Sequence, residues 1–109
     1  MNFTKIKNSK DLLGSDIREA GLRIAEAGLR AIDTETAIRE GVKIQGNQLV
    51  VRGKSFPVEG ISRILVVGVG KCSLEAGRAL EEVLGDRLHG GIVRDVHEGS
   101  LKKIKAYAG

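Results

Sequence analysis

The sequence has few of the residues that stabilise small secreted proteins or stack on nucleic-acid bases. Its 109 residues include one cysteine, Cys72, one proline, one tyrosine, two phenylalanines and no tryptophan. A single cysteine excludes an intramolecular disulfide, so we expect a reducing, cytoplasmic compartment. The scarcity of aromatic rings removes the platforms on which single-stranded nucleic acids stack. These absences predict a cytoplasmic protein that does not bind nucleic acid.

Long hydrophobic runs are also missing. The apolar run at residues 64–67 is far shorter than the ~20 residues that a helix needs to cross a membrane. Residues 1–10 carry three lysines but lack the apolar stretch and small-residue cleavage site of a secretory signal. We therefore expect no membrane partner and no secretory leader.

The positive charge is not concentrated in one place. The net charge is +4, and residues 1–60 and 61–109 each contribute +2. The densest basic cluster is Lys102, Lys103 and Lys105, and Tyr107 is the only aromatic residue beside it. A nucleic-acid surface normally concentrates basic residues on one face or along one helix. We interpret these lysines as a solvated face.

The first 60 residues show helical spacing followed by strand spacing. Apolar residues recur at helical intervals over residues 11–32, which predicts one long amphipathic helix. A short helix is expected after Asp33 or Thr34, ending near Gly41. Residues 42–45 and 48–52 then alternate around turn residues, which predicts a β-hairpin. We expect a loop from there to Gly60.

The remaining residues alternate between strand and helix patterns. The run at residues 64–67 is typical of a strand that is buried on both faces of a parallel sheet. An amphipathic helix is expected at residues 73–84, followed by strands at 91–93 and 104–107. Strand, glycine turn, helix and strand make a βαβ unit, whose crossover is expected to be right-handed.

These patterns together predict an α/β fold. Its main part is a Rossmann-like parallel βαβ unit over residues 61–109, preceded by a helical region over 1–41 and by a hairpin with a loop over 42–60. We expect residues 1–109 to form a single partial domain.

Candidate functional residues cluster in the glycine turn between the buried strand and its helix. Such turns bind ligands in α/β proteins, because glycines admit a close approach and the helix N-terminus attracts anions. Gly68, Gly70 and Ser73 are therefore candidate cofactor-binding residues, and Lys71 is a candidate catalytic residue. In the alternative interpretation the glycines only make a tight turn and Lys71 is solvated.

Two phosphate-binding motifs can be tested against this turn. The P-loop pattern fails twice, because Leu65 stands where its first glycine belongs and Cys72 replaces the Ser or Thr that holds magnesium. The dinucleotide pattern G-x-G-x-x-G matches Gly68 and Gly70 but has Ser73 at its third glycine. The nearest acidic residue at a strand end is Asp95. An NAD(P)-binding oxidoreductase module therefore stays open as an alternative.

Histidine and cysteine residues do not form a metal-binding pattern. His89 and His97 are separated by a predicted strand, and with Cys72 they match no known zinc spacing. We interpret both histidines as ordinary surface or loop residues and predict no metal site. Cys72 is expected to be a small, buried core residue.

Three short segments stand out together: residues 64–71, with the G-x-G-K turn, residues 81–87, with a Leu-Gly pair, and the Gly-Gly-Ile-Val run at 90–93. They resemble the N-terminal part of the type II glycerate 2-kinases, whose members are often labelled hydroxypyruvate reductases. The long first helix and residues 33–38 are also similar to the opening of that family. The resemblance extends over nearly the whole chain from about residue 12.

The resemblance implies ATP-dependent phosphorylation of the 2-hydroxyl of D-glycerate, with magnesium, in a cleft between two domains. The lysine of the G-x-G-K turn is catalytic or binds substrate in that family, and this role carries over to Lys71. Family members are much longer, and residues 94–99 depart from the family pattern, which more often has a Thr and an aromatic residue there. We therefore expect a fragment or truncated member that is inactive alone.

The implied partners are a small-molecule hydroxy acid and a nucleotide, provided that the rest of the enzyme is present. Two alternatives from other classes stay open. One is an NAD(P)-binding module of hydroxypyruvate reductase type. The other is a non-catalytic interaction module whose exposed apolar face pairs with itself, giving a homo-oligomer, or with a missing partner segment.

Overall fold

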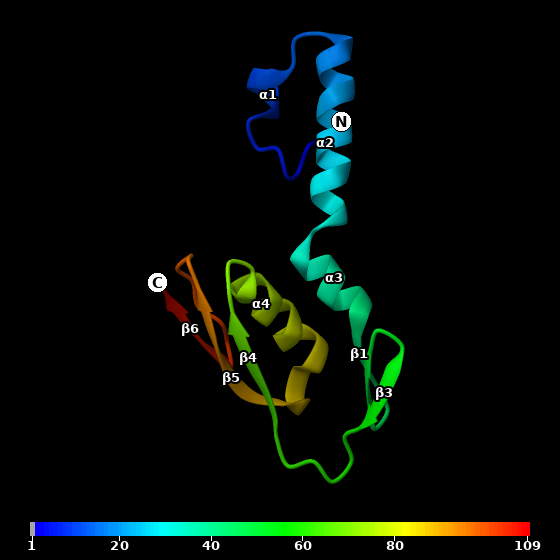
Figure 1. The fold of residues 1–109 in the computed structure, drawn as a ribbon, viewed down its shortest axis with the longest axis vertical. Coiled ribbons are helices and arrows are strands. Elements are labelled where there is room, and N and C mark those ends of the chain that lie inside the picture. The colour runs from blue at the N-terminus through cyan, green and yellow to red at the C-terminus, as the bar shows by residue number, and fades with distance from the viewer. Residues whose placement is uncertain (1) are drawn as a thin grey trace. The chain divides into compact units, whose positions relative to one another are not determined.

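The computed structural model describes residues 2–109, and Figure 1 shows their helices and strands. The chain divides into two compact units, Met1–Asp33 and Thr34–Gly109, which are described separately below. The first unit contains α1 (Ser9–Leu12) and α2 (Asp16–Ala31). The second contains, in chain order, α3 (Thr34–Gly41), β1 (Val42–Gln45), β2 (Gln48–Val51), β3 (Lys54–Pro57), β4 (Ile64–Val69), α4 (Ser73–Leu84), the 3-10 helix η1 (Gly85–Arg87), β5 (Leu88–Asp95) and β6 (Ile104–Ala108).

The first unit contains two helices where one was expected. The prediction of a continuous helix from residue 11 is wrong, because the chain is extended at Leu13 and at Ser15. The Ser15 side chain accepts a hydrogen bond from the Arg18 backbone N–H at 3.3 Å, which caps the start of α2. Asp16 and Glu19 in the first turn of α2 complement the positive end of its dipole.

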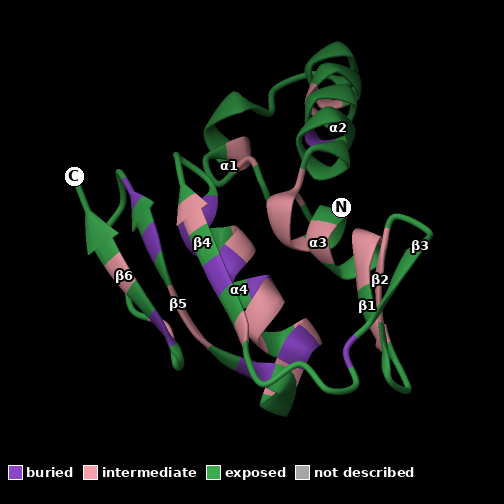
Figure 2. Ribbon diagram, turned by 60° about the horizontal axis from the view of Figure 1, so that its bottom comes forward, coloured by how far each residue is buried: buried purple, intermediate pink, exposed green. Residues whose placement is uncertain are grey.

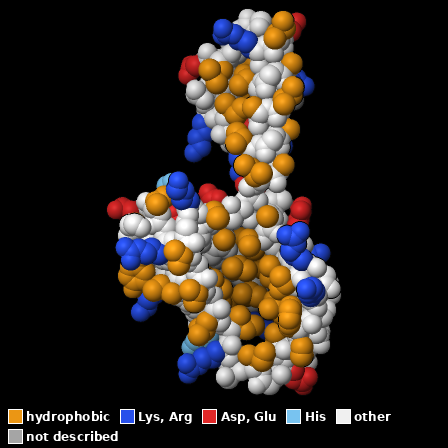
Figure 3. All heavy atoms as spheres, viewed as in Figure 1, with side chains coloured by type: hydrophobic (Ala, Val, Ile, Leu, Met, Phe, Trp, Pro, Cys, Tyr) orange, Lys and Arg blue, Asp and Glu red, His pale blue; other side chains and the backbone are white. Residues whose placement is uncertain are grey.

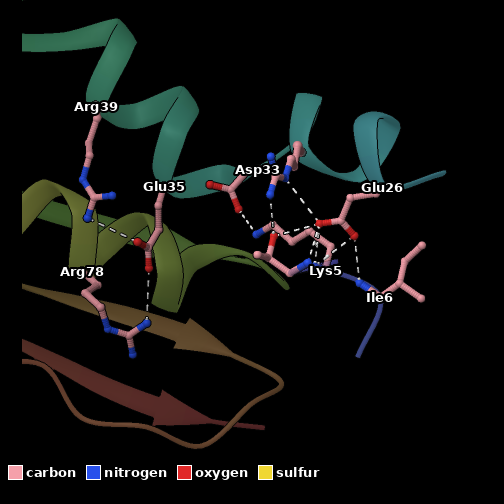
Figure 4. A network of polar contacts seen from close by, with 9 residues as sticks. Lys5, Ile6, Glu26, Asp33, Glu35, Arg39 and Arg78 are labelled. Carbon is pink, nitrogen blue, oxygen red and sulfur yellow. Dashed lines mark hydrogen bonds and ion pairs between the residues drawn. The ribbon is translucent and has the colours of Figure 1, made fainter. Parts of the chain in front are cut away.

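A buried carboxylate holds the N-terminal segment against α2. Glu26 Oε1 accepts hydrogen bonds from the Thr4 backbone N–H at 2.7 Å and from the Thr4 hydroxyl at 2.8 Å, and Oε2 accepts one from the Ile6 N–H at 3.0 Å. Figure 4 shows Lys5 and Ile6 beside the Glu26 carboxylate. Burial would raise the pKa of Glu26, but hydrogen bonds from the backbone of Lys5, Thr4 and Ile6 and from the Thr4 hydroxyl lower it to about 2. The carboxylate therefore stays ionised.

The second unit begins with a small antiparallel sheet of order β1-β2-β3. The predicted hairpin is confirmed, but the prediction of a loop at residues 54–57 is wrong, because these residues form β3. Arg52 and Gly53 connect β2 to β3 with φ of 47° and 80°. Two positive φ angles in a two-residue connection favour a tight hairpin. Pro57 is tolerated at the end of β3 because β3 is an edge strand.

The parallel sheet of order β4-β5-β6 carries the main core. The expected helix is confirmed as α4, which ends before Gly85 at φ 53°. The core side chains come from β4, α4, β5 and β6: Val66, Leu84, Leu88, Val93 and Ile104. Figure 2 shows buried segments alternating with exposed ones along β4 and β5, beside α4. The α/β class and the parallel βαβ unit are thus both present.

The other face of this sheet is open within residues 34–109. The expectation that the strand at residues 64–67 is buried on both faces is wrong, because Val66 is 9% exposed whereas Leu65 is 58% and Val67 77% exposed. Side chains alternate across a strand, and α4 covers only the side toward which Val66 points. The uncovered apolar side chains, which we call the open sheet face, are Leu65, Val67, Val69, Ile92 and Tyr107.

Ion pairs join α3 to α4. Arg39 Nη2 lies 2.6 Å from Glu82 Oε2 and 3.3 Å from Glu35 Oε2, and Arg78 Nη1 lies 3.6 Å from Glu35 Oε1. Figure 4 shows Arg39 and Arg78 on either side of Glu35. Figure 3 shows hydrophobic side chains gathered between α4 and the antiparallel sheet. Among residues 2–109, no helix has both the length and the apolar character that crossing a membrane would need.

Candidate functional site

The predicted glycine turn lies at the carboxyl end of β4. The Gly70 backbone N–H donates to the Arg94 carbonyl of β5 at 3.0 Å, which holds the turn beside the neighbouring strand. Gly70 has φ +131°, a conformation that residues with a side chain rarely adopt. A glycine is therefore required at this position for the chain to turn from β4 into α4.

Gly68 serves a different purpose from Gly70. A Cβ added at residue 68 would lie 3.1 Å from Val93 Cγ1 and 3.2 Å from Ser73 Cβ, both of which are tight contacts. Gly68 thus allows the start of α4 to pack closely on β4 and β5. The space that its missing side chain leaves is filled by protein, so the structure gives Gly68 a packing role.

Ser73 is also engaged by protein groups. Its backbone N–H donates to the Gly70 carbonyl at 3.2 Å. Its hydroxyl lies 2.9 Å from the Gly70 carbonyl and 2.8 Å from the Arg94 carbonyl. Ser73 is 6% exposed. These contacts tie the first turn of α4 to the glycine turn and to the end of β5.

A buried carboxylate occupies the N-terminus of α4. Asp95, at the end of β5, is 3% exposed, and its Oδ2 accepts a hydrogen bond from the Leu74 N–H at 2.9 Å. Its Oδ1 accepts a second bond from the His97 backbone N–H at 2.9 Å. The hydrogen bonds from Leu74 and His97 lower the pKa of Asp95 to about 2, although burial opposes this shift. The ionised carboxylate is suited to the positive end of a helix dipole.

Asp95 changes what α4 can offer to a ligand. Besides Leu74, the Ser73 N–H is bonded to Gly70 and the Ala76 N–H to the Cys72 carbonyl. Much of the backbone cradle expected from the sequence is therefore filled by the protein itself. The cationic group beside it is Lys71, which is exposed, so its side chain rather than the helix terminus is the main feature available to an anion.

Two other residues at this edge show features that the sequence did not predict. Cys72 is exposed, so the prediction of a buried core cysteine is wrong; the residue precedes α4 and its side chain points away from the core. His97 is exposed in the loop after β5, as predicted, but its Nδ1 also lies 2.9 Å from Asp95 Oδ1. Reasoning from the sequence missed this contact. The available signal was an acidic residue two positions before a histidine, directly after a predicted strand.

Metal and dinucleotide binding find little support in these residues. Within the described part of the chain, no three His, Cys, Asp or Glu side chains converge on a point that could hold a metal ion. These residues by themselves therefore do not supply a complete set of protein ligands for a metal ion. Both oxygens of Asp95 are engaged and buried, so this carboxylate is not available to a ribose hydroxyl. That geometry disfavours the NAD(P) alternative.

The fold and this edge define a class of protein. A parallel sheet with α4 packed on one face and a glycine turn at the carboxyl end of β4 places the chain in the α/β class. The chain belongs to the family described as "Domain of unknown function (DUF4147)", whose model matches residues 21–109.

Known relatives agree with the resemblance found in the sequence. The chain is 31% identical over 94 residues to a glycerate 2-kinase of Pyrococcus horikoshii. The aligned region covers 86% of this chain and 21% of that protein. The crystal structure of the PH0495 protein from the same organism matches with a TM-score of 0.68 and 31% identity, over 88% of this chain and 22% of that one. The chain spans about a fifth of the length of these relatives. The family resemblance is thereby confirmed.

Proposed function

We propose that this chain forms the N-terminal part of an ATP-dependent D-glycerate 2-kinase and that Lys71 contacts the anionic substrate or nucleotide. The observation that carries the proposal is the match over most of the chain to a glycerate 2-kinase. The position of Lys71, exposed after the Gly70 turn, agrees with it. Phosphoryl transfer depends on positioning and on neutralising negative charge, and a lysine ammonium supplies positive charge.

The residues of this chain contribute only part of that chemistry. ATP would supply the phosphoryl group, and the Gly70 turn with Lys71 would face its phosphates or the glycerate carboxylate. No step of the proposal passes through magnesium, because residues 2–109 bring no suitable donor set together. Since the chain spans about a fifth of its relatives, we expect no glycerate-dependent ADP formation by the purified chain alone.

Ligand binding tests the proposal directly on this chain. In amide NMR spectra of the isotope-labelled protein, D-glycerate or ATP should shift the resonances of residues 70–73. Lys71→Gln should weaken this binding by roughly 10-fold or more, the loss expected for a charged hydrogen bond of ~1.5–3 kcal/mol. Lys43→Gln is the matched control, because Lys43 is an exposed lysine on β1. Resonances of the turn that ignore both ligands, or that respond to NADH instead, would contradict the proposal.

A second candidate function, self-association, is favoured by the open sheet face. Its five apolar side chains lie on adjacent parallel strands, and Val67 and Val69 are 77% and 83% exposed. Burying such a surface is favourable in proportion to its area. Sedimentation should then show a mass that rises with protein concentration, and Val67→Lys should abolish the rise. A monomer at every concentration would exclude this function.

A further inference from the structure

The side chain of His97 is exposed but held in one orientation. Its imidazole is 71% exposed, while the Asp95 carboxylate that binds its Nδ1 is 2% exposed. The same carboxylate oxygen also accepts the His97 backbone N–H. Ring and backbone are therefore anchored to one buried atom, Asp95 Oδ1.

This contact decides which ring nitrogen carries the proton. An ionised carboxylate can only accept hydrogen bonds, so the hydrogen between Nδ1 and Oδ1 belongs to Nδ1. In the neutral imidazole, the lone pair then lies on Nε2. No hydrogen bond joins Nε2 to any group in residues 2–109. His97 thus presents a hydrogen-bond acceptor to solvent.

His97 and Lys71 both lie just beyond the carboxyl ends of neighbouring strands. β4 and β5 are neighbouring parallel strands, with Val69 paired to Arg94 at their ends. Lys71 follows the Gly70 turn after β4, and His97 follows Asp95 at the end of β5. The bond from Leu74 to Asp95 connects the start of α4 to the same carboxylate that holds His97.

Capping of α4 does not account for the histidine. The bond between Asp95 Oδ2 and Leu74 satisfies the helix N–H by itself. An exposed imidazole adds little buried apolar area, so its benefit to folding is small. An anchored imidazole with a fixed tautomer and an open Nε2 is, however, the arrangement of a general base.

We propose that His97 Nε2 accepts the proton of the 2-hydroxyl group of a 2-hydroxy acid substrate, and that Asp95 is the positioning residue that keeps Nε2 in its acceptor form. This inference rests on the proposed function. The hydroxyl O–H bond breaks and its proton passes to Nε2, while the oxygen forms a bond to the terminal phosphorus of a nucleoside triphosphate. The bond from that phosphorus to the nucleoside diphosphate breaks, and its electron pair leaves with the diphosphate.

The role of Asp95 can be tested without any ligand. Long-range ¹H–¹⁵N spectra of the histidine rings, recorded where the imidazoles are neutral, distinguish the two tautomers. We expect His97 to carry its proton on Nδ1 and to lose this preference in Asp95→Asn. His89, exposed near the opposite end of β5, is the internal reference. If His97 in the unmodified chain carries its proton on Nε2, the positioning role is excluded, whether or not Asp95→Asn folds.

The role of His97 is tested with D-glycerate and with 3-hydroxypropionate, which lacks the 2-hydroxyl. His97→Asn keeps a donor for Asp95 but removes the Nε2 acceptor. It should weaken D-glycerate binding ~3- to 10-fold, the value of one neutral hydrogen bond, and leave 3-hydroxypropionate binding unchanged. His89→Asn is the matched control and should change neither.

The possible results separate this inference from the proposed function. If D-glycerate shifts the resonances of residues 70–73 but not the His97 ring, the inference fails and the kinase proposal stands. Equal weakening of both ligands by His97→Asn also overturns the inference. If neither D-glycerate nor ATP shifts the turn, and D-glycerate leaves the ring unchanged, the proposed function fails, and the base role of His97 fails with it.

Discussion

Gly91→Ala is the substitution whose effect the structure determines most sharply. A Cβ at residue 91 would lie 2.1 Å from the Val66 carbonyl oxygen and 2.9 Å from both Val66 C and N. All three atoms belong to the backbone of β4, so no side-chain rotation relieves the clash, and β4 must move away from β5. Overpacking of a core usually costs about 1–3 kcal/mol, and we expect a backbone clash to reach or exceed ~3 kcal/mol.

The size of this loss is measurable by urea denaturation. Small proteins have m-values of about 1–3 kcal/mol/M, so ~3 kcal/mol lowers the midpoint by ~1–3 M. Gly90→Ala is the matched control, because its Cβ would lie 3.6 Å from the Lys103 carbonyl oxygen, an ordinary contact. We expect its midpoint to stay close to that of the unmodified chain. Equal midpoints for the two variants would refute the packing geometry of β4 and β5.

Three further predictions follow from the buried groups. Because the native pKa of Asp95 is about 2 and its ordinary value is 3.8, its stabilising contribution is present above pH ~4 and is lost as the pH falls toward 2. Urea midpoints should therefore fall over that range, and less steeply in Asp95→Asn. Leu88→Ala should cost ~2–5 kcal/mol in thermal or urea unfolding, since Leu88 is 2% exposed in the core. Glu26→Gln should accelerate hydrogen exchange at the Lys5 and Ile6 amides and leave β5 unaffected; unchanged exchange there would contradict the anchoring role of Glu26.

Asp95 occupies the N-terminus of α4, where the glycine turn would otherwise offer backbone N–H groups to a phosphate. A glycine turn before a helix suggests a backbone cradle for phosphate. Here the cradle is already bonded to the protein's own groups, including a carboxylate. Under the two proposals above, Lys71 and His97 at the rim are the side chains expected to contact the anion and the hydroxyl. Both are exposed, and both follow directly from the ends of neighbouring strands.

Local signals were sufficient for some elements and misleading for others. α4 agrees with its prediction at both ends because its apolar stripe is regular and Gly85 ends it. The start of α2 was missed because helical spacing continues through Leu13, although Gly14 and Ser15 mark a break and a cap. β3 was missed because Pro57 discourages a strand assignment. The turn at Arg52 and Gly53 was the signal that could have revealed it.

The candidate site was only partly accessible to sequence reasoning. Lys71 and Gly70 belong to a contiguous motif, so their placement after a strand was predictable. Asp95 and Leu74 are 21 residues apart in the sequence. No local pattern predicts that the Asp95 carboxylate caps α4, the helix that contains Leu74. Gly68 and Gly70 look equivalent in the motif, yet one makes room for Val93 and the other adopts a positive φ.

By itself, the sequence determined the α/β class, the strand–turn–helix order and the family resemblance, because these depend on residue type and on short-range spacing. Only the tertiary structure decided that Asp95 fills the N-terminus of α4, that Asp95 also contacts Nδ1 of His97, and that one face of the parallel sheet is open within residues 34–109. Each of these depends on which groups meet after the chain has folded. Packing determines which distant residues form hydrogen bonds and which side chains become buried. No single segment of the sequence contains the information that determines this packing.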